Sequence, residues 1–318
     1  MQPTLIILNP HAAGGRAGRV WQELEPILWE RLGELVVVVT QRPEEVAGHL
    51  ETAYSDYGIR RVIAIGGDGT NHSLINAVIA LNEKTAAHDP MIYGNIPVGT
   101  GRDWARGRGI PTGDLHAMTA WIATAQPQPV DIGMLTLDEN SDERREYFLN
   151  IASVGLSGSV TKRVNRVNNR RPWTFLTATI ASILTYKPQP LHIELDGQTW
   201  YEGGTYLLAV ANGTTFGRGM KIAPNAQASD GQFDVILVKQ VPKLEILTAL
   251  QHVYDGSHLT HHAVLHTRAK NVSVTAASKR ASAASHETDP IQMELDGEFF
   301  AGRTLSFQVR PGLVQILS

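Results

Sequence analysis

A glycine-rich motif, Gly-Gly-Asp-Gly-Thr at residues 66–70, places one acid among residues suited to holding phosphate. The apolar run 62–65 precedes it, and residues 74–79 repeat apolar side chains at helical spacing, so a buried strand turns into a helix here. At such a turn, free backbone N–H groups and the helix dipole bind anions, and glycine lets a phosphate approach the main chain. Asp68 would repel that phosphate unless it binds a metal ion or a proton. The alternative is an ordinary turn capped by Asp68.

Two further glycine-bearing loops follow apolar runs. They are Asn-Pro-His-Ala-Ala-Gly-Gly-Arg at 9–16 and Pro-Val-Gly-Thr-Gly-Arg-Asp-Trp-Ala-Arg at 97–106. In an open parallel sheet the carboxyl ends of neighbouring strands share one ligand-binding crevice. The dinucleotide pattern GxGxxG followed by an acid and the Walker pattern GxxxxGK[ST] are both absent from the sequence. The three loops therefore predict a phosphate site of another class.

The spacing of apolar residues along the chain predicts the strands and helices that position these loops. Residues 1–128 alternate short β-branched runs with amphipathic stretches, which is typical of βαβ units and a parallel sheet. We expect strands at 5–8, 35–40, 61–65 and 91–97, and helices at 19–32, 44–57, 73–82 and 114–125.

Beyond residue 128 the pattern changes to strands joined by Asp-Gly turns, which favours an antiparallel sheet. We expect strands at 131–137, 146–152, 191–195, 206–211, 233–238, 271–276 and 292–295, with helices at 157–186 and 243–254. The sequence thus predicts an α/β nucleotide-binding domain at 1–128, a β-rich acceptor domain at 129–305 and a tail at 306–318 that returns to the first lobe. A cleft between the two lobes is expected.

The amino-acid composition excludes several classes of function. The chain has 318 residues, a net charge of −3 and no cysteine, which excludes disulfides and thiolate chemistry and gives no general attraction to nucleic acid. No stretch is apolar enough for a membrane span, and the first residues are not typical of a signal peptide. We expect a cytoplasmic protein that binds no nucleic acid; monomer and homodimer both stay open.

The ordered motifs resemble the diacylglycerol kinase catalytic domain family, and within it the soluble bacterial lipid kinases related to sphingosine kinases. The resemblance covers nearly the whole chain. Besides the motifs at 66–70 and 97–106, it rests on 148–155, 211–224, 230–235 and Leu-Asp-Gly-Glu at 295–298. It implies an NAD-kinase-like or phosphofructokinase-like first lobe and ATP-dependent, Mg²⁺-assisted phosphorylation of a lipid hydroxyl, on diacylglycerol or a related lipid.

The resemblance also implies site residues. Those expected to bind ATP are Asn9, Pro10, Gly14, Gly15, Arg16, Thr40, Gly66, Gly67, Asp68, Gly69, Thr70, Asn71, His72, Thr100 and Asp103. The expected catalytic residues are Asp68, which organises the magnesium nucleotide, and Glu298 with Asp296, which activate the acceptor. A structural Mg²⁺ in the second lobe is expected around Asp230, with carbonyls near Gln227 and Gln232.

The chain departs from the family pattern in three places. Ser73 stands where a glutamate is usual, Arg102 stands where asparagine is common, and Ser-Gly-Ser at 157–159 stands where an Asp/Ala-Glu pair is usual. Asp68, Asp103 and Glu298 are retained, so the reaction class is expected to survive while nucleotide preference and acceptor stay open.

The Asp-Gly-Glu turn has a purely structural alternative. Ile-Glu-Leu-Asp-Gly-Gln at 193–198 nearly repeats Met-Glu-Leu-Asp-Gly-Glu at 293–298, and Asp-Gly between alternating strands is a strong hairpin signal. The first copy has Gln198 where the second has Glu298, which is the difference expected if only the second is catalytic.

A basic stretch beside aromatic residues suits the headgroup layer of an anionic membrane. Its charges are Lys162, Arg163, Arg166, Arg170 and Arg171. The alternative is a solvated helix face. A lipid acceptor met by peripheral membrane association is the favoured interpretation. Open alternatives are an NAD-kinase-like transferase with a soluble acceptor and a non-catalytic nucleotide- or lipid-binding regulator.

Overall fold

The computed structural model describes residues 3–85, 89–99, 101–139, 142–167, 173–277 and 289–318. The chain divides into two compact units. The first unit is Met1–Ile132 with Pro311–Ser318, and the second is Gly133–Arg310. The last residues of the chain thus belong to the first unit, where Ser318 and Gln126 exchange two backbone hydrogen bonds of 3.1 Å.

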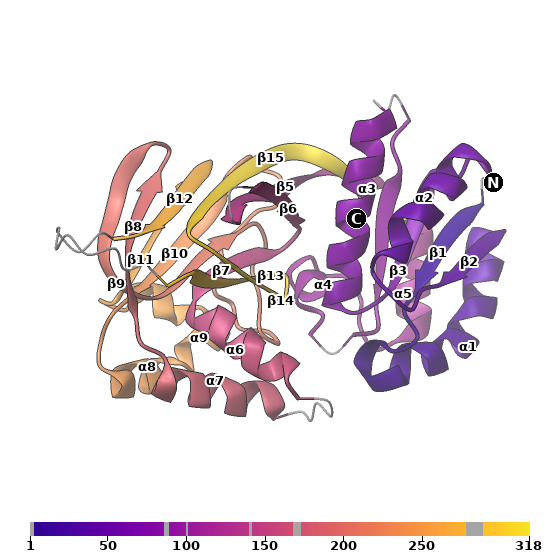
Figure 1. Cartoon of the computed structure of the whole chain (residues 1–318). Helices are drawn as coiled ribbons and strands as arrows, with labels where there is room; N and C mark the ends of the chain where they lie inside the picture. The colour runs from indigo at the N-terminus through magenta and orange to yellow at the C-terminus, as the bar shows by residue number, and fades with distance from the viewer. Residues whose placement is uncertain (1–2, 86–88, 100, 140–141, 168–172, 278–288) are drawn as a thin grey trace. The chain divides into compact units, whose positions relative to one another are not determined.

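The first unit contains a parallel sheet in the order β2–β1–β3–β4 (Figure 1). Its strands are β1 (Thr4–Leu8), β2 (Leu35–Val39), β3 (Arg61–Gly66) and β4 (Ile92–Pro97). The end of β15 (Thr304–Leu317) adds a further parallel partner, with Ile316 opposite Tyr93. All residues of β1 are buried, as expected for a strand covered on both faces. The predicted α/β lobe is confirmed.

Helices cover this sheet because their apolar residues recur on one face. They are α1 (Ala12–Leu32), α2 (Glu45–Ser55), α3 (Asp68–Thr85), α4 (Asp103–Gly107) and α5 (Leu115–Thr124). Ala13, Gly14 and Gly15 have positive φ, so regular α1 helix begins only after the predicted loop. Helix α3 begins earlier than the predicted 73–82, because the Gly-Asp-Gly-Thr residues form its first turn.

The second unit is built on antiparallel strands, which confirms the predicted β-rich lobe. The strands follow the order β14–β13–β7–β9–β8–β12–β15, and β10 pairs with β9 and β11. They are β6 (Asp142–Phe148), β7 (Ile151–Gly155), β8 (Gln189–Leu195), β9 (Gln198–Ala211), β10 (Phe233–Lys239), β11 (Val264–Ala269), β12 (Asn271–Ala276), β13 (Ile291–Leu295) and β14 (Glu298–Gly302), and β5 (Pro127–Glu139) leads in from the first unit. Phe148 lies at the centre of the core, stacked on Phe233 and edge-on to Phe307.

Three predicted elements of the second unit are wrong in extent. The single strand predicted at 146–152 is two strands, β6 and β7, and the helix predicted at 243–254 is α8 (Lys243–Ala249) followed by α9 (His252–Asp255). The helix predicted at 157–186 is α6 (Leu156–Asn165) and α7 (Thr174–Thr185). Strands β11, β14 and β15 were not predicted. Residues 257–260 form a short 3₁₀ helix, η1 (Ser257–Thr260).

Candidate functional site

In the first unit, the loops after β1, β3 and β4 meet through hydrogen bonds. The Asn9 backbone N–H donates to Ile65 O (3.1 Å), and its side-chain amide donates to Thr70 Oγ1 (3.3 Å). The Gly99 N–H donates to Gly66 O (3.0 Å). The structure therefore brings the three predicted glycine loops together at the carboxyl edge of the sheet, where α/β proteins bind ligands.

Three glycines in these loops leave no room for a side chain. A Cβ on Gly99 would lie 2.7 Å from the Cα of Gly67. A Cβ on Gly66 would strike the side chain of Thr70, and one on Gly101 would strike the carboxylate of Asp68. The glycines are thus required by close packing of one loop on another, which keeps main-chain groups accessible to a ligand.

Two carboxylates lie at this junction. Asp68 is the first residue of α3, and Asp103 is the first residue of α4. Both side chains lie beside Gly101, because the same Cβ built there would be close to Asp68 Oδ2 and 3.5 Å from Asp103 Oδ2. Asp103 is buried and pairs with Arg106 at 3.0 Å. Carboxylate oxygens are the donors that Mg²⁺ prefers when it is bound with phosphates, so this pair fits a magnesium nucleotide.

Arginine side chains add positive charge beside the carboxylates. Arg102 has left-handed backbone geometry (φ 58°), and its Nε donates to Gly99 O at 2.7 Å. Burial, followed by repulsion from Arg16 and Arg106, lowers the pKa of Arg102. Arg102 is therefore close enough to Arg16 and to Arg106 for their charges to act on it, a repulsion that a bound phosphate would relieve. Arg16 was predicted as a ligand; Arg102 appeared only as a departure from the family, and Arg106 only as part of its motif.

The remaining predicted nucleotide residues lie in different settings. Thr40 is buried after β2, where its backbone N–H and hydroxyl both donate to Leu8 O. The Asn71 side-chain oxygen accepts from Tyr93 OH and from Asn95 Nδ2, so it holds α3 on β4. Pro10, Gly14, Gly15, Gly67, Gly69 and His72 belong to the same loops or to the first turns of α1 and α3, and Thr100 lies outside the described residues.

In the second unit, the aspartates of the two similar hairpins, Asp196 and Asp296, have the same backbone conformation and make similar hydrogen bonds. Asp296 and Gly297 both have positive φ, as do Asp196 and Gly197, which is the type I′ geometry of a two-residue turn. The Asp296 carboxylate accepts three backbone N–H groups at 2.7–3.0 Å. Asp196 accepts two in the equivalent way from the loop between β11 and β12. The aspartate of each turn thus joins its hairpin to a neighbouring segment.

The three groups that donate to Asp296 are the N–H groups of Leu149, Asn150 and Ile151. These three bonds fix the Asp296 side chain and hold the turn against residues 149–151. Glu298 is the exposed first residue of β14, and the next side chain, Phe299, lies under the ammonium of Lys162 at 5.4 Å. Of the two predicted catalytic acids in the hairpin, Asp296 is held by main-chain donors and Glu298 is exposed.

The acid predicted to bind structural magnesium has a cationic neighbour. Asp230 Oδ1 accepts the backbone N–H of Gln232, and Oδ2 is buried and lies 3.4 Å from Arg268 Nη1. Arg268 Nε also lies 3.5 Å from Asp234 Oδ2. Burial raises the pKa of Asp234, and Arg268 acts in the opposite direction. Asp230 Oδ2 thus faces a guanidinium, and the carbonyls near Gln227 and Gln232 stay predicted ligands.

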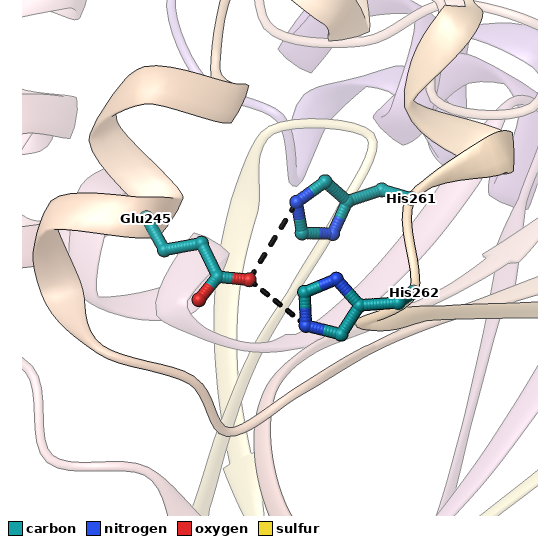
Figure 2. Close-up of side chains that lie close together, drawn as sticks. All are labelled: Glu245, His261 and His262. Atoms are coloured by element: carbon teal, nitrogen blue, oxygen red, sulfur yellow. Dashed lines mark ion pairs between the residues drawn. The ribbon is translucent and has the colours of Figure 1, made fainter.

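A cluster that the sequence did not predict joins Glu245 to His261 and His262 (Figure 2). Glu245 Oε1 lies 3.6 Å from His261 Nε2 and 3.1 Å from His262 Nε2. The spacing would suit a metal ion, but His261 Nδ1 accepts the N–H of Ala263. The neutral ring then carries its proton on Nε2, so no lone pair remains there for a metal. Glu245 Oε1 is buried and has no hydrogen-bond partner among the described residues, so the cluster joins α8 to the segment leading into β11 through these two close contacts alone.

Family models match both parts of the chain. The diacylglycerol kinase catalytic domain matches residues 3–135, and the YegS C-terminal NAD kinase beta sandwich-like domain matches residues 150–318, more than half of the chain. The chain therefore belongs to the diacylglycerol kinase-like lipid kinase family, in which these two domains are combined.

Known proteins agree with this assignment. A diacylglycerol kinase from Mycobacterium tuberculosis is 28% identical over 274 residues, covering 85% of this chain and 81% of its own. A probable YegS-like lipid kinase from Stenotrophomonas maltophilia is 28% identical over 98% of this chain and 94% of its own. The crystal structure of a putative diacylglycerol kinase from Bacillus anthracis has the same fold, with a TM-score of 0.73, 22% identity and coverage of 99% and 96%.

Proposed function

We propose that the protein transfers the terminal phosphate of ATP, with Mg²⁺, to a hydroxyl of diacylglycerol or a related lipid. The observation that carries the proposal is the junction in the first unit, where two carboxylates and an arginine cluster surround loops that only glycine can form. Phosphoryl transfer requires mainly positioning and charge neutralisation, and this junction offers both.

The first unit would bind the nucleotide. Backbone N–H groups of the glycine loops and the guanidinium groups of Arg16 and Arg102 suit the phosphate oxygens. Asp68, with Asp103 beside it, would hold the Mg²⁺, which neutralises charge on the phosphates when it is bound. Ser73, the departure from the family pattern, donates its hydroxyl to Gly69 O and thus supports the first turn of α3.

The second unit would supply the proton acceptor. In the proposed step, the lipid hydroxyl oxygen forms a bond to the terminal phosphorus, the bond to the β-phosphate oxygen breaks, and Glu298 takes the hydroxyl proton. Asp296 would act as a positioning residue, because its bonds to residues 149–151 fix the turn that carries Glu298.

Helix α7 offers a surface for the lipid layer. Trp173, Leu176, Ile180 and Leu184 are all exposed and recur at helical spacing, so they form an apolar stripe. A cation lies at one end of it, where Lys243 Nζ donates to Leu184 O. An apolar stripe beside a cation suits an anionic bilayer surface. We therefore propose a cytoplasmic protein that associates peripherally with membranes.

The predicted basic docking stretch needs revision. Arg163 donates to hydroxyls of Ser182 and Thr185, so it fastens α6 to α7, and Lys162 contacts Phe299. Arg170 and Arg171 lie outside the described residues. Within the part of the chain that the structure describes, no helix combines the length and apolarity needed to cross a bilayer.

A panel of acceptors tests the proposed function. The purified protein is incubated with Mg²⁺ and terminally labelled ATP, in separate reactions with diacylglycerol, a sphingoid base or NAD, and lipids are then extracted. Label in the organic phase supports the lipid kinase. Label on NAD would favour the NAD-kinase-like alternative, and nucleotide binding without transfer to any acceptor would favour the regulator.

A further inference from the structure

Arg268 lies between two acids because of the strand register. Asp234 of β10 and Arg268 of β11 are directly opposite partners in the antiparallel pair. Asp230 precedes β10 by a short turn, in which its Oδ1 accepts the N–H of Gln232. The guanidinium therefore reaches Asp230 Oδ2 at 3.4 Å and Asp234 Oδ2 at 3.5 Å.

A third oxygen completes the surroundings of this guanidinium. Arg268 Nη2 donates to the backbone carbonyl of Asn225 at 3.4 Å. Two carboxylates and a carbonyl are the donor set that a hard divalent cation takes, and here they converge on one cationic side chain. Asp230 Oδ2 is buried and has no hydrogen-bond partner among the described residues, so the charge of the 42% exposed Arg268 side chain beside it offsets part of the cost of removing that oxygen from water.

The guanidinium and a divalent ion compete for Asp230 Oδ2. Mg²⁺ binds carboxylate oxygen at about 2.1 Å and requires near-octahedral coordination. An ion on Asp230 Oδ2 would then lie within a few ångströms of Arg268 Nη1. The two cations repel each other at this separation, and the double charge of Mg²⁺ doubles that repulsion.

We propose that Arg268 is the resident cation of the Asp230–Asp234 site, so this site holds no structural divalent ion in the wild-type protein, and that removing Arg268 creates a divalent-cation site. This inference concerns the second unit alone and does not rest on the proposed kinase activity. It departs from the structural magnesium that the family resemblance implied.

Metal-dependent stability tests the proposal without any activity measurement. Calorimetric unfolding is recorded without nucleotide, with and without 10 mM MgCl₂, for the wild type, Arg268→Ala and Arg268→Gln. Binding of Mn²⁺ to each folded protein is counted by electron paramagnetic resonance. Lys270→Ala is the matched control, because it removes an exposed cation two residues away along the chain.

The proposal predicts that Mg²⁺ raises the Tm of an Arg268 variant by about 3 °C or more relative to its effect on the wild type. The variant should also bind one Mn²⁺ more than the wild type, and Lys270→Ala should behave as the wild type. If Arg268→Ala does not fold, Arg268→Gln, which keeps a polar side chain, decides the question. A Mg²⁺-dependent Tm increase in the wild type that Asp230→Asn abolishes would overturn the proposal, as would an Arg268 variant that gains no ion.

Discussion

Asp68 supplies the carboxylate that the proposed phosphoryl transfer needs at the place where the three glycine loops of the first unit meet. Without an acid, the loops and arginines of the first unit would form a plain anion site. With Asp68 against Gly101 and Asp103 close by, the same site presents oxygen ligands next to phosphate donors. That combination is typical of sites that bind a nucleotide together with its metal ion.

Asp68→Asn should therefore lower the turnover number at least a hundredfold, because a neutral amide cannot balance the charge of Mg²⁺. The free energy of unfolding should change little, since the lost carboxylate belongs to a loop edge. Turnover and thermal unfolding are measured on the same preparations. Asp56→Asn, at an exposed position after α2, serves as the control for charge loss. Near-normal turnover of folded Asp68→Asn would refute the metal-organising role.

The duplicated hairpins provide an internal comparison for Glu298. Glu298→Gln should lower kcat by roughly a hundredfold or more, in line with loss of a general base. Gln198→Glu places the same acid on the other hairpin and should leave kcat unchanged. Small and equal effects at the two positions would show that the 295–298 turn is only a hairpin.

Substitution of the aspartates in the same turns should lower the free energy of unfolding, whereas substitution of Glu298 should lower kcat. Asp296→Asn weakens charge-assisted hydrogen bonds to three N–H groups and should destabilise the protein by about 1–3 kcal/mol. Asp196→Asn should also destabilise, because it makes equivalent bonds. Denaturant unfolding gives both values, and only Asp296→Asn should also lower kcat. If Asp296→Asn removed activity with no loss of stability, Asp296 itself would be the proton acceptor.

At the scale of elements, the sequence predicted the strands and helices that local pattern determines. Buried β-branched runs such as 61–65 were correctly placed, and the two Asp-Gly hairpins formed as expected. The strand predicted at 146–152 failed for a long-range reason. The N–H groups of residues 149–151 bond to the carboxylate of Asp296, which interrupts the strand and could not be seen locally.

The long helix predicted at 157–186 failed because its apolar spacing continues on both sides of a break. Helix α6 ends at Asn165, and α7 begins at Thr174. Their separation allows Arg163 to donate to hydroxyls of α7, a contact that needs two helices rather than one. The apolar stripe of α7 follows from this arrangement.

That stripe gives a prediction at the same scale. Replacing Leu176 and Ile180 together by glutamate should weaken binding to anionic vesicles at least tenfold, because each exposed aliphatic side chain would lose its burial in the bilayer interface. Vesicle co-sedimentation measures the change. Trp29→Glu, an exposed aromatic position on α1, is the control and should bind as the wild type. Undiminished binding of the double variant would assign the stripe to another role.

At the scale of the whole molecule, the sequence motifs predicted which loops of the first unit come together, because parallel strands end at a common edge. They did not predict that Arg16 lies near Arg102, because the two residues are far apart along the chain and belong to different loops. They also did not predict Arg268, since a cross-strand pair depends on register between β10 and β11. Side-chain neighbours set by tertiary packing are the part that local pattern misses.

The central claim is that phosphate passes from a nucleotide to a lipid, and one measurement tests it most directly. The wild-type protein is given Mg²⁺, labelled ATP and anionic vesicles that contain diacylglycerol, and ADP release and phosphorylated lipid are counted in the same time course. The account predicts one phosphorylated lipid for each ADP, and loss of both products when Mg²⁺ is chelated. ADP release without phosphorylated lipid, or no nucleotide turnover by folded protein at these vesicles, would contradict it.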